Sequence, residues 1–102
     1  MYNLFELPRL PLDEEHSTVL AKGRNMVRIE RIVSTGQTSD WYDDSETEFV
    51  ALLSGSAVIE YADGHKVYLA TGATLILQPH ERHRVAFTST DPPAIWLCFF
   101  YE

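Results

Sequence analysis

The chain has 102 residues, of which 45% are hydrophobic and 23% charged, proportions that are ordinary for one soluble globular domain. Eight Lys and Arg stand against fifteen Asp and Glu, and the resulting net charge of −7 argues against nucleic acid or an anionic membrane surface as a partner. No apolar run approaches the roughly 20 residues of a membrane span, and the single cysteine, Cys98, excludes an internal disulfide.

The beginning of the chain and its cysteine content together predict a location. Residues 1–12, MYNLFELPRLPL, lack a positive start followed by an apolar run, so we expect no signal peptide. A single cysteine suits a reducing compartment. We therefore expect a cytoplasmic protein.

Residues 1–24 are expected to precede the main body of the fold. Pro8 and Pro11 indicate an extended arm over residues 1–12. The segment LDEEHSTVLAKG, residues 12–23, predicts one short helix. Asp13 is a candidate N-cap, acidic residues follow it at the positive helix end, and Gly23 can close the C-terminus.

Short apolar segments follow one another through the rest of the chain. MVRIERIVS alternates apolar with charged residues over part of its length, and Asp63-Gly64 within YADGHKVYL is the strongest hairpin signal. The predicted strands lie within 26–34, 48–54, 56–62, 61–69, 71–79, 83–89 and 94–102. Some seven short strands with turn signals between most of them predict an all-β sandwich or barrel, in one domain of residues 1–102.

The segment AIWLCFFY, residues 94–101, is apolar on both faces. Ile95, Leu97 and Phe99 oppose Trp96 and Cys98 because side chains alternate along a strand. A lone barrel of this size would leave one face wet, so either the N-terminal arm and helix cover it or a second subunit does. We favour a homodimer.

Glu48 is the last charge before the apolar run FVALL. It shares a face with Val50 and Leu52, so if these point into the barrel its carboxylate points in as well. A cation, an Arg or water must then satisfy it, because an unpaired buried carboxylate is costly. In the alternative, Glu48 faces solvent at the first residue of the strand.

The stretch QPHERHRVAF holds a second cluster of polar residues. By the same parity His83 shares a face with Val85 and Phe87, which makes it either a satisfied core residue or a ligand. His80 lies three residues earlier, in a turn after Pro79. Two His and one Glu at a single barrel mouth would suit Zn, Fe, Mn, Ni or Co.

The spacing of these residues resembles the cupin family. The first cupin motif is Gly, five residues, His, one residue, His, three residues, Glu, six residues, Gly. GQTSDWYDDSETEFVALLSG places Gly36, Tyr42, Asp44, Glu48 and Gly55 on these positions. Both glycines and the glutamate match, and Tyr42 and Asp44 stand where the two His are expected.

The second cupin motif is Gly, five residues, Pro, one residue, Gly, two residues, His, three residues, Asn. It falls on Gly72, Gln78, His80, His83 and Phe87, of which Gly72 and His83 match. The two motifs span residues 36–87, about half of the chain. They look most similar to small single-domain bacterial cupins whose first motif runs Trp-Tyr-Asp and lacks its two His.

The resemblance implies a cupin-type, jelly-roll-like β-barrel over residues 25–102, with a divalent metal ion inside. Glu48 and His83 would bind the metal, with Asp44 as a further oxygen ligand. His80 has no family role, but a turn could swing its ring to the same ion. Tyr42 is a poor ligand while its phenol is protonated. Tyr42 or Asp44 would instead handle protons during catalysis.

These expectations leave several functions open. The first is a small metal-binding cupin acting on an unknown small organic molecule, with dioxygenase, isomerase and lyase chemistries all implied by the resemblance. The second is a non-catalytic cupin that binds or senses a small ligand without a functional metal. A third is a structural dimeric partner of a larger enzyme. A fold alone does not choose among them.

Other polar and aromatic residues have simpler explanations. His65 follows a turn and is expected in solvent, and Cys98 is expected to be a small core residue. Arg82 and Arg84 either bind an anionic substrate or pair outward with acids. Trp41 either walls a pocket with Tyr42 or lies on a surface loop. No serine-nucleophile or phosphate-cradling motif is present.

Overall fold

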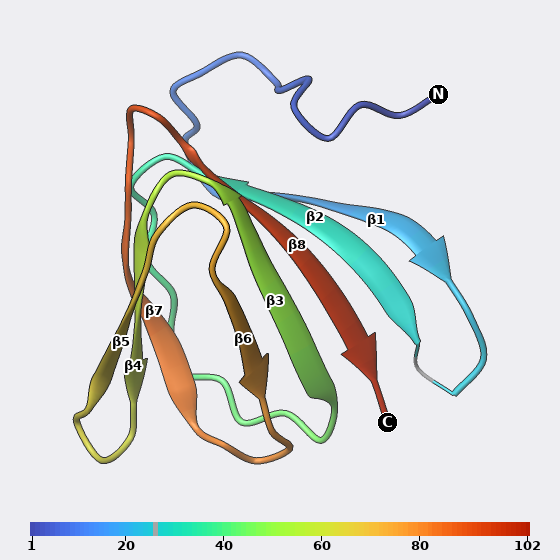
Figure 1. Cartoon of the computed structure of the whole chain (residues 1–102), viewed down its shortest axis with the longest axis vertical. Coiled ribbons are helices and arrows are strands. Elements are labelled where there is room, and N and C mark those ends of the chain that lie inside the picture. Colours follow the sequence, from blue (N-terminus) through green and yellow to red (C-terminus); the bar gives the residue numbers. More distant parts are fainter. Residues whose placement is uncertain (26) are drawn as a thin grey trace.

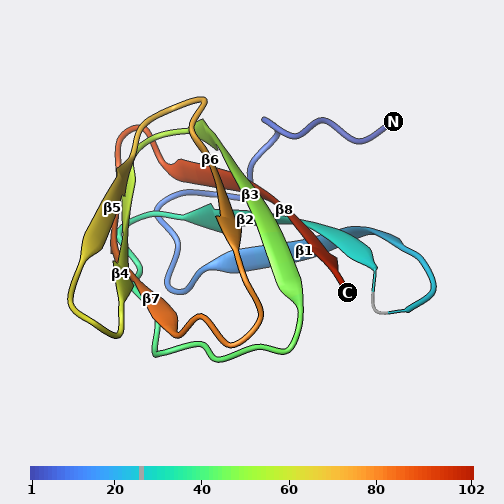
Figure 2. The ribbon, with the colours of Figure 1, turned by 60° about the horizontal axis from the view of Figure 1, so that its bottom comes forward.

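The computed structural model describes residues 1–25 and 27–102, and these form eight strands in two antiparallel sheets (Figure 1). The larger sheet has the strand order β1-β2-β8-β3-β6, and the smaller one β5-β4-β7. In both views the smaller sheet lies beside β6 and β3, and β1 forms the opposite edge (Figures 1 and 2). The strands are β1 (His16–Lys22), β2 (Arg28–Ser34), β3 (Thr47–Ser54), β4 (Ala57–Tyr61), β5 (Lys66–Leu69), β6 (Thr74–Leu77), β7 (His83–Thr88) and β8 (Ala94–Tyr101).

The helix predicted over residues 12–23 is wrong, because β1 occupies this segment. It pairs antiparallel with β2, from His16 opposite Val33 to Lys22 opposite Arg28. This pairing satisfies backbone groups at the edge of β2, and such a tertiary demand overrides the capping signals. None of the described residues is helical, so this part of the chain also offers no helix that could cross a membrane.

Alternation along the strands builds the interior of the barrel. Its buried apolar cluster draws on both sheets and includes Val50, Leu52, Ile59, Trp96 and Cys98. Towards the end where β3 begins and β8 ends, one cross-strand row contains charged as well as apolar side chains. That row consists of Arg28, Phe100, Glu48 and Leu77. The interior is therefore apolar in its depth and charged towards this end.

The hairpin predicted at Asp63-Gly64 is confirmed. β4 and β5 pair from Ala57 opposite Leu69 to Glu60 opposite Lys66. Gly64 has a φ of +93°, in the left-handed region that glycine adopts without strain. The turn leaves His65 exposed, as expected.

β7 departs from simple alternation. Val58 lies opposite Phe87, but the next residue of β4, Ile59, lies opposite Val85, so β7 carries one extra residue as a bulge. Beyond the bulge the faces exchange: Phe87 is 50% exposed and Thr88 is buried. The predicted parity was therefore wrong for Phe87, since a shift of one residue turns a side chain to the other face.

The N-terminal arm covers one part of the outer face of the larger sheet. The buried Arg31 of β2 donates from Nη1 to the carbonyl oxygens of Leu4 (3.3 Å) and Glu6 (2.7 Å), and its guanidinium lies 5.1 Å from the centre of the Tyr2 ring. On the same sheet Phe99 remains 37% exposed. The arm thus leaves part of this apolar face open.

Candidate functional site

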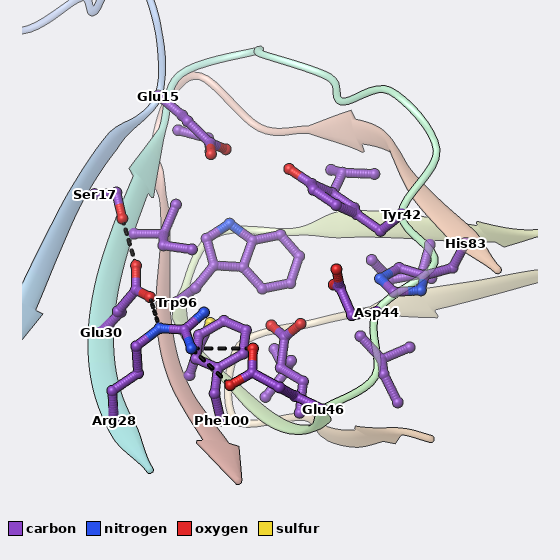
Figure 3. Close-up of a pocket in the computed structure, with 18 residues that line it drawn as sticks. Glu15, Ser17, Arg28, Glu30, Tyr42, Asp44, Glu46, His83, Trp96 and Phe100 are labelled. Carbon is purple, nitrogen blue, oxygen red and sulfur yellow. Dashed lines mark hydrogen bonds and ion pairs between the residues drawn. The ribbon is translucent and has the colours of Figure 1, made fainter. Parts of the chain in front are cut away.

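A cavity of about 280 Å³ lies between the two sheets. Its apolar wall includes Val50, Ile59 and Trp96. Five carboxylates, one guanidinium, one imidazole and one phenol also line it. In Figure 3, Tyr42, Asp44 and His83 stand on one side of the cavity, and Glu15, Glu30 and Arg28 stand on the other.

Alternate residues of one continuous segment reach the cavity: Tyr42, Asp44, Glu46 and Glu48. Backbone pairing explains why strand-like alternation begins before β3. Tyr42 N donates to His83 O (2.7 Å), and His83 N donates to Tyr42 O (3.1 Å). Asp44 O then accepts from His80 N (2.7 Å). An isolated bridge and one further hydrogen bond hold the segment beside β7, and its even-numbered side chains share one face.

Glu48 points into the cavity, as the parity argument predicts. It shares the lining with Val50, lies opposite Phe100 in β8 and is mostly buried. Burial, with a smaller contribution from the nearby Asp44 carboxylate, raises the pKa of Glu48 to about 7. Glu48 therefore changes charge near neutral pH.

His83 is a buried polar side chain of the cavity wall, with 6% exposed. Its Nδ1 lies 2.8 Å from the carbonyl oxygen of Glu81. A carbonyl only accepts, so Nδ1 carries the proton, and the neutral ring then offers Nε2 as an acceptor. Such an anchored imidazole is oriented to bind a proton donor or a metal ion.

Sequence reasoning missed a charged cluster on the other side of the cavity. Arg28 Nε donates to Glu30 (2.6 Å), and Arg28 Nη1 donates to both carboxylate oxygens of Glu46 (3.0 and 2.7 Å). Burial opposes ionisation of Glu30, but hydrogen bonds from Ser17 and Arg28 lower its pKa overall. Alternation of Arg28, Glu30 and Ile32 in β2 was a usable signal, as was Glu46 standing two residues before Glu48.

Glu15 is the fifth carboxylate of the cavity, and it was expected in a helix. It directly precedes β1, and its pKa is raised by burial and by the charge of Glu30. The pKa of Tyr42, across the cavity, is also raised, first by burial and then by Glu15. Both shifts come first from burial, and neighbouring carboxylates add to them.

His80 does not line the cavity, so it is not brought together with Glu48 and His83. Its Nδ1 lies 2.8 Å from Asp43 Oδ1, and both side chains are exposed. Its φ is +59°, a left-handed conformation that is uncommon outside glycine. This position corresponds to a glycine in the second cupin motif. The backbone geometry is thus kept although the residue has changed.

The chemistry of Glu48, Asp44 and His83 suits a divalent metal ion, but their arrangement does not form a ready-made centre. Among the described residues, no three His, Cys, Asp or Glu side chains gather closely enough to hold a metal. The candidate metal ligands of the cavity are therefore spread along its wall and do not converge on one point.

Other candidates take the simpler of their two expected roles. Arg84 Nε donates to Glu60 (2.6 Å), and the guanidinium of Arg84 lies 4.9 Å from the ring centre of Trp41, which does not line the cavity. Cys98 is a buried residue of the core cluster, and burial raises the pKa of its thiol well above the usual value. A raised pKa keeps the thiol protonated, and a protonated thiol is a poor nucleophile.

The structure is similar to several solved bacterial structures. A Ralstonia eutropha JMP134 protein named "putative mannose-6-phosphate isomerase" is 35% identical with a TM-score of 0.92, covering 100% of this chain and 97% of that one. A cupin superfamily protein from Desulfitobacterium hafniense DCB-2 is 19% identical, with a TM-score of 0.77 and coverage of 90% and 81%. An RmlC-like cupin from Desulfovibrio desulfuricans is 15% identical, with a TM-score of 0.80 and coverage of 99% and 94%.

A search of curated proteins found no match. The family model of the cupin domain, in contrast, matches residues 30–100. The match spans β2 to β8 almost completely and includes every position of both motifs. The chain therefore belongs to the cupin family.

Proposed function

We propose that this cupin binds a small organic molecule in its barrel cavity, in contact with Glu48, Asp44, Tyr42 and His83. One observation carries the proposal: a single partly enclosed cavity, apolar in its depth, collects polar side chains from distant parts of the chain. Its volume, about 280 Å³, lies at the lower end of the range for ligand pockets. The ligand is accordingly a small metabolite.

Acid–base chemistry is the reaction class that the wall supports best. A carboxyl with a pKa of about 7 both accepts and gives up a proton near neutral pH, which is the property required of Glu48 as general base or acid. Tyr42 and Asp44 stand on the same wall to move or hold a second proton. Isomerase and lyase reactions need such transfers.

A sugar phosphate does not suit this cavity, although the Ralstonia relative is named for such a substrate. Five carboxylates would repel the phosphate. The one guanidinium that could attract it, Arg28, is already paired with Glu30 and Glu46. Mannose-6-phosphate isomerase activity is therefore not proposed for this chain.

A metal-binding cupin is the second candidate, and the orientation of His83 favours it. With Nδ1 bound to a backbone carbonyl, His83 has the arrangement that metal-binding imidazoles adopt. Glu48 and Asp44 would be oxygen ligands for Zn, Fe, Mn, Ni or Co. A metal would supply electrophilic assistance to a bound oxygen. It would have to draw these three side chains together.

Retention of small molecules tests the first candidate. Purified protein in chelator is mixed with a metabolite extract, washed, and analysed by mass spectrometry of the released compounds. We expect one compound class to be retained by the wild type and lost in Glu48→Gln and His83→Ala. Retention should persist in His80→Gly, since His80 lies outside the cavity. Retention that survives both cavity changes would contradict the proposal.

Metal analysis decides the second candidate. Protein purified without a chelating tag is analysed for metal by mass spectrometry, before and after titration with each divalent ion. Near-stoichiometric metal that disappears in Glu48→Gln and His83→Ala but stays in His80→Gly would favour a metal centre. Wild-type protein that takes up no metal under titration would exclude it.

A further inference from the structure

The charges around the cavity are unevenly balanced. Of its five carboxylates, Glu30 and Glu46 are bound to Arg28 by hydrogen bonds of 2.6 to 3.0 Å. The other three carboxylates, those of Glu15, Asp44 and Glu48, make no ion pair with any described residue. No Lys is among the described residues that line the cavity. An occupant therefore meets a net negative wall.

The buried imidazole adds an acceptor that has no partner. His83 Nδ1 is bound to the carbonyl of Glu81, and no described residue makes a hydrogen bond to Nε2. His83 is 6% exposed and lines the cavity, so water reaches its ring poorly except from the cavity. The rest of the ring is buried, so Nε2 meets only what occupies the cavity, and a ligand N–H group would give it a direct hydrogen bond.

The surroundings of Arg28 show that the cavity wall can bind a cationic group. The Arg28 guanidinium lies 4.0 Å from the centre of the Phe100 ring while its N–H groups reach two carboxylates. Rings and carboxylates together are the surroundings that stabilise a partly desolvated cation. Trp96 and Tyr42 present further rings to the same cavity, and Tyr42 stands on the side away from Arg28 (Figure 3).

We infer that the molecule bound in the cavity is a small organic cation with an alkylammonium or guanidinium head group. The inference rests on the proposed function and adds the charge of the ligand. The head group donates to Asp44 and the free nitrogen of His83, Glu15 across the cavity adds negative charge, and the alkyl part lies against Val50 and Ile59. A neutral polyol would leave the carboxylates uncompensated, and an anion would be repelled.

Two probes of nearly the same shape test the charge preference: n-butylguanidinium and the neutral n-butylurea. Each is titrated into the full chain in buffer with chelator, so that no metal bridges the contact. Binding is read from the indole N–H NMR signal of Trp96, which is assigned with Trp41→Phe. We expect the cation to bind at least about tenfold more tightly than the urea, with an affinity that falls as salt rises.

Adjacent carboxylates provide matched variants. Asp44→Asn and Glu15→Gln keep size and remove charge, and each should weaken butylguanidinium binding about three- to tenfold while leaving butylurea binding unchanged. Asp43→Asn removes an exposed carboxylate that contacts His80 outside the cavity, and it should change neither affinity. An Asp43→Asn effect as large as that of Asp44→Asn would overturn the inference.

The possible failures are distinguishable. If butylurea binds as tightly as the cation, the cavity still takes a small organic molecule and only the charge preference is wrong. If neither probe shifts the Trp96 signal, the inference is also overturned, while retention of metabolites by the wild type and its loss in His83→Ala still decide the proposed function.

Discussion

Glu48 is an ionisable residue that lies in a mostly apolar interior. It begins the apolar stretch of β3, whose even-numbered residues face the barrel, so the carboxylate is carried into a poorly hydrated interior. Arg28 lies in the same cross-strand row, but its ion pairs are with Glu30 and Glu46. The interior therefore holds an acid whose charge is only partly compensated.

The pH dependence of stability should reveal Glu48. Its pKa is raised to about 7 in the folded chain, so the stability it contributes is fully present below about pH 4.5 and is lost as pH rises through 7. Glu48→Gln should therefore be more stable than the wild type at pH 8, by on the order of 2–3 kcal/mol, and similar to it near pH 4. Denaturant unfolding at both pH values measures the difference.

A second carboxylate serves as control for this experiment. Glu60→Gln removes a carboxylate that lies outside the cavity and pairs with Arg84. Its effect on the free energy of unfolding should not grow between pH 4 and pH 8 in the same manner. A constant difference between Glu48→Gln and the wild type at all pH values would contradict an inward, desolvated carboxylate.

Replacing His80 should have little effect on stability when the new residue is glycine and a larger effect when it is β-branched. Its φ of +59° suits glycine, and its contact with Asp43 is exposed, so we expect His80→Gly to change the free energy of unfolding by less than about 1 kcal/mol. His80→Val places a β-branched side chain in the same conformation and should cost about 1–2 kcal/mol. Thermal or denaturant unfolding checks both; equal losses would show that side-chain contacts decide this position.

Parity along the chain predicted much of the cavity wall. Alternation placed Glu48 inward, and the motif spacing singled out Tyr42, Asp44 and His83, which all line one cavity. Their catalytic and metal-binding roles stay predictions. The Arg28 cluster escaped notice because its meaning depends on the pairing of β2 with β8, which brings together residues far apart in sequence.

At the scale of elements, the positions of the strands could be predicted from the sequence better than the pairing between them. Each predicted strand has a counterpart from β2 to β8, since apolar alternation and turn residues are local signals. β1 was misread because Asp13 and Gly23 resemble helix ends, whereas its partner, β2, is visible only in the fold. The bulge in β7 was equally invisible, because it depends on the register against β4.

Gly55, in the turn between β3 and β4, should tolerate substitution less well than Gly72, another glycine of the cupin motifs. Gly55 has a φ of +86°, and a Cβ there would lie 2.6 Å from the carbonyl oxygen of Pro93 and 2.9 Å from Ala94 Cα. Gly55→Ala combines backbone strain with overpacking against main chain, so we expect a loss of about 3 kcal/mol or more in the free energy of unfolding.

Gly72→Ala is the matched substitution for that experiment. Gly72 has a similar φ of +90°, but no atom of the residues that the structure describes lies within 4 Å of the added Cβ. Backbone strain alone should then cost about 1–2 kcal/mol. Denaturant unfolding of both variants separates strain from steric contact. Equal losses would mean that the segment around Pro93 moves away at little cost.

At the scale of the whole molecule, an apolar row on the outer face of the larger sheet remains partly exposed. Ile29, Phe99, Phe49 and Ile76 lie opposite one another across β2, β8, β3 and β6. Phe49 and Phe99 pack edge to face, while Ile76 is 47% exposed. The N-terminal arm is anchored at Arg31 instead. We propose that a second copy of the chain covers this row and makes a homodimer, because a contiguous apolar face is unfavourable in water.

Phe99→Asp should convert the proposed dimer to a monomer. The change places a charge at the centre of the row, where pairing with a second copy would bury it without a partner. Light scattering coupled to size-exclusion chromatography should report a dimer for the wild type at micromolar concentration and a monomer for the variant. Phe87→Asp is the matched control, because Phe87 is also exposed but lies on the smaller sheet. A monomeric wild type would contradict the proposal, and a dimer broken by Phe87→Asp alone would move the interface to the smaller sheet.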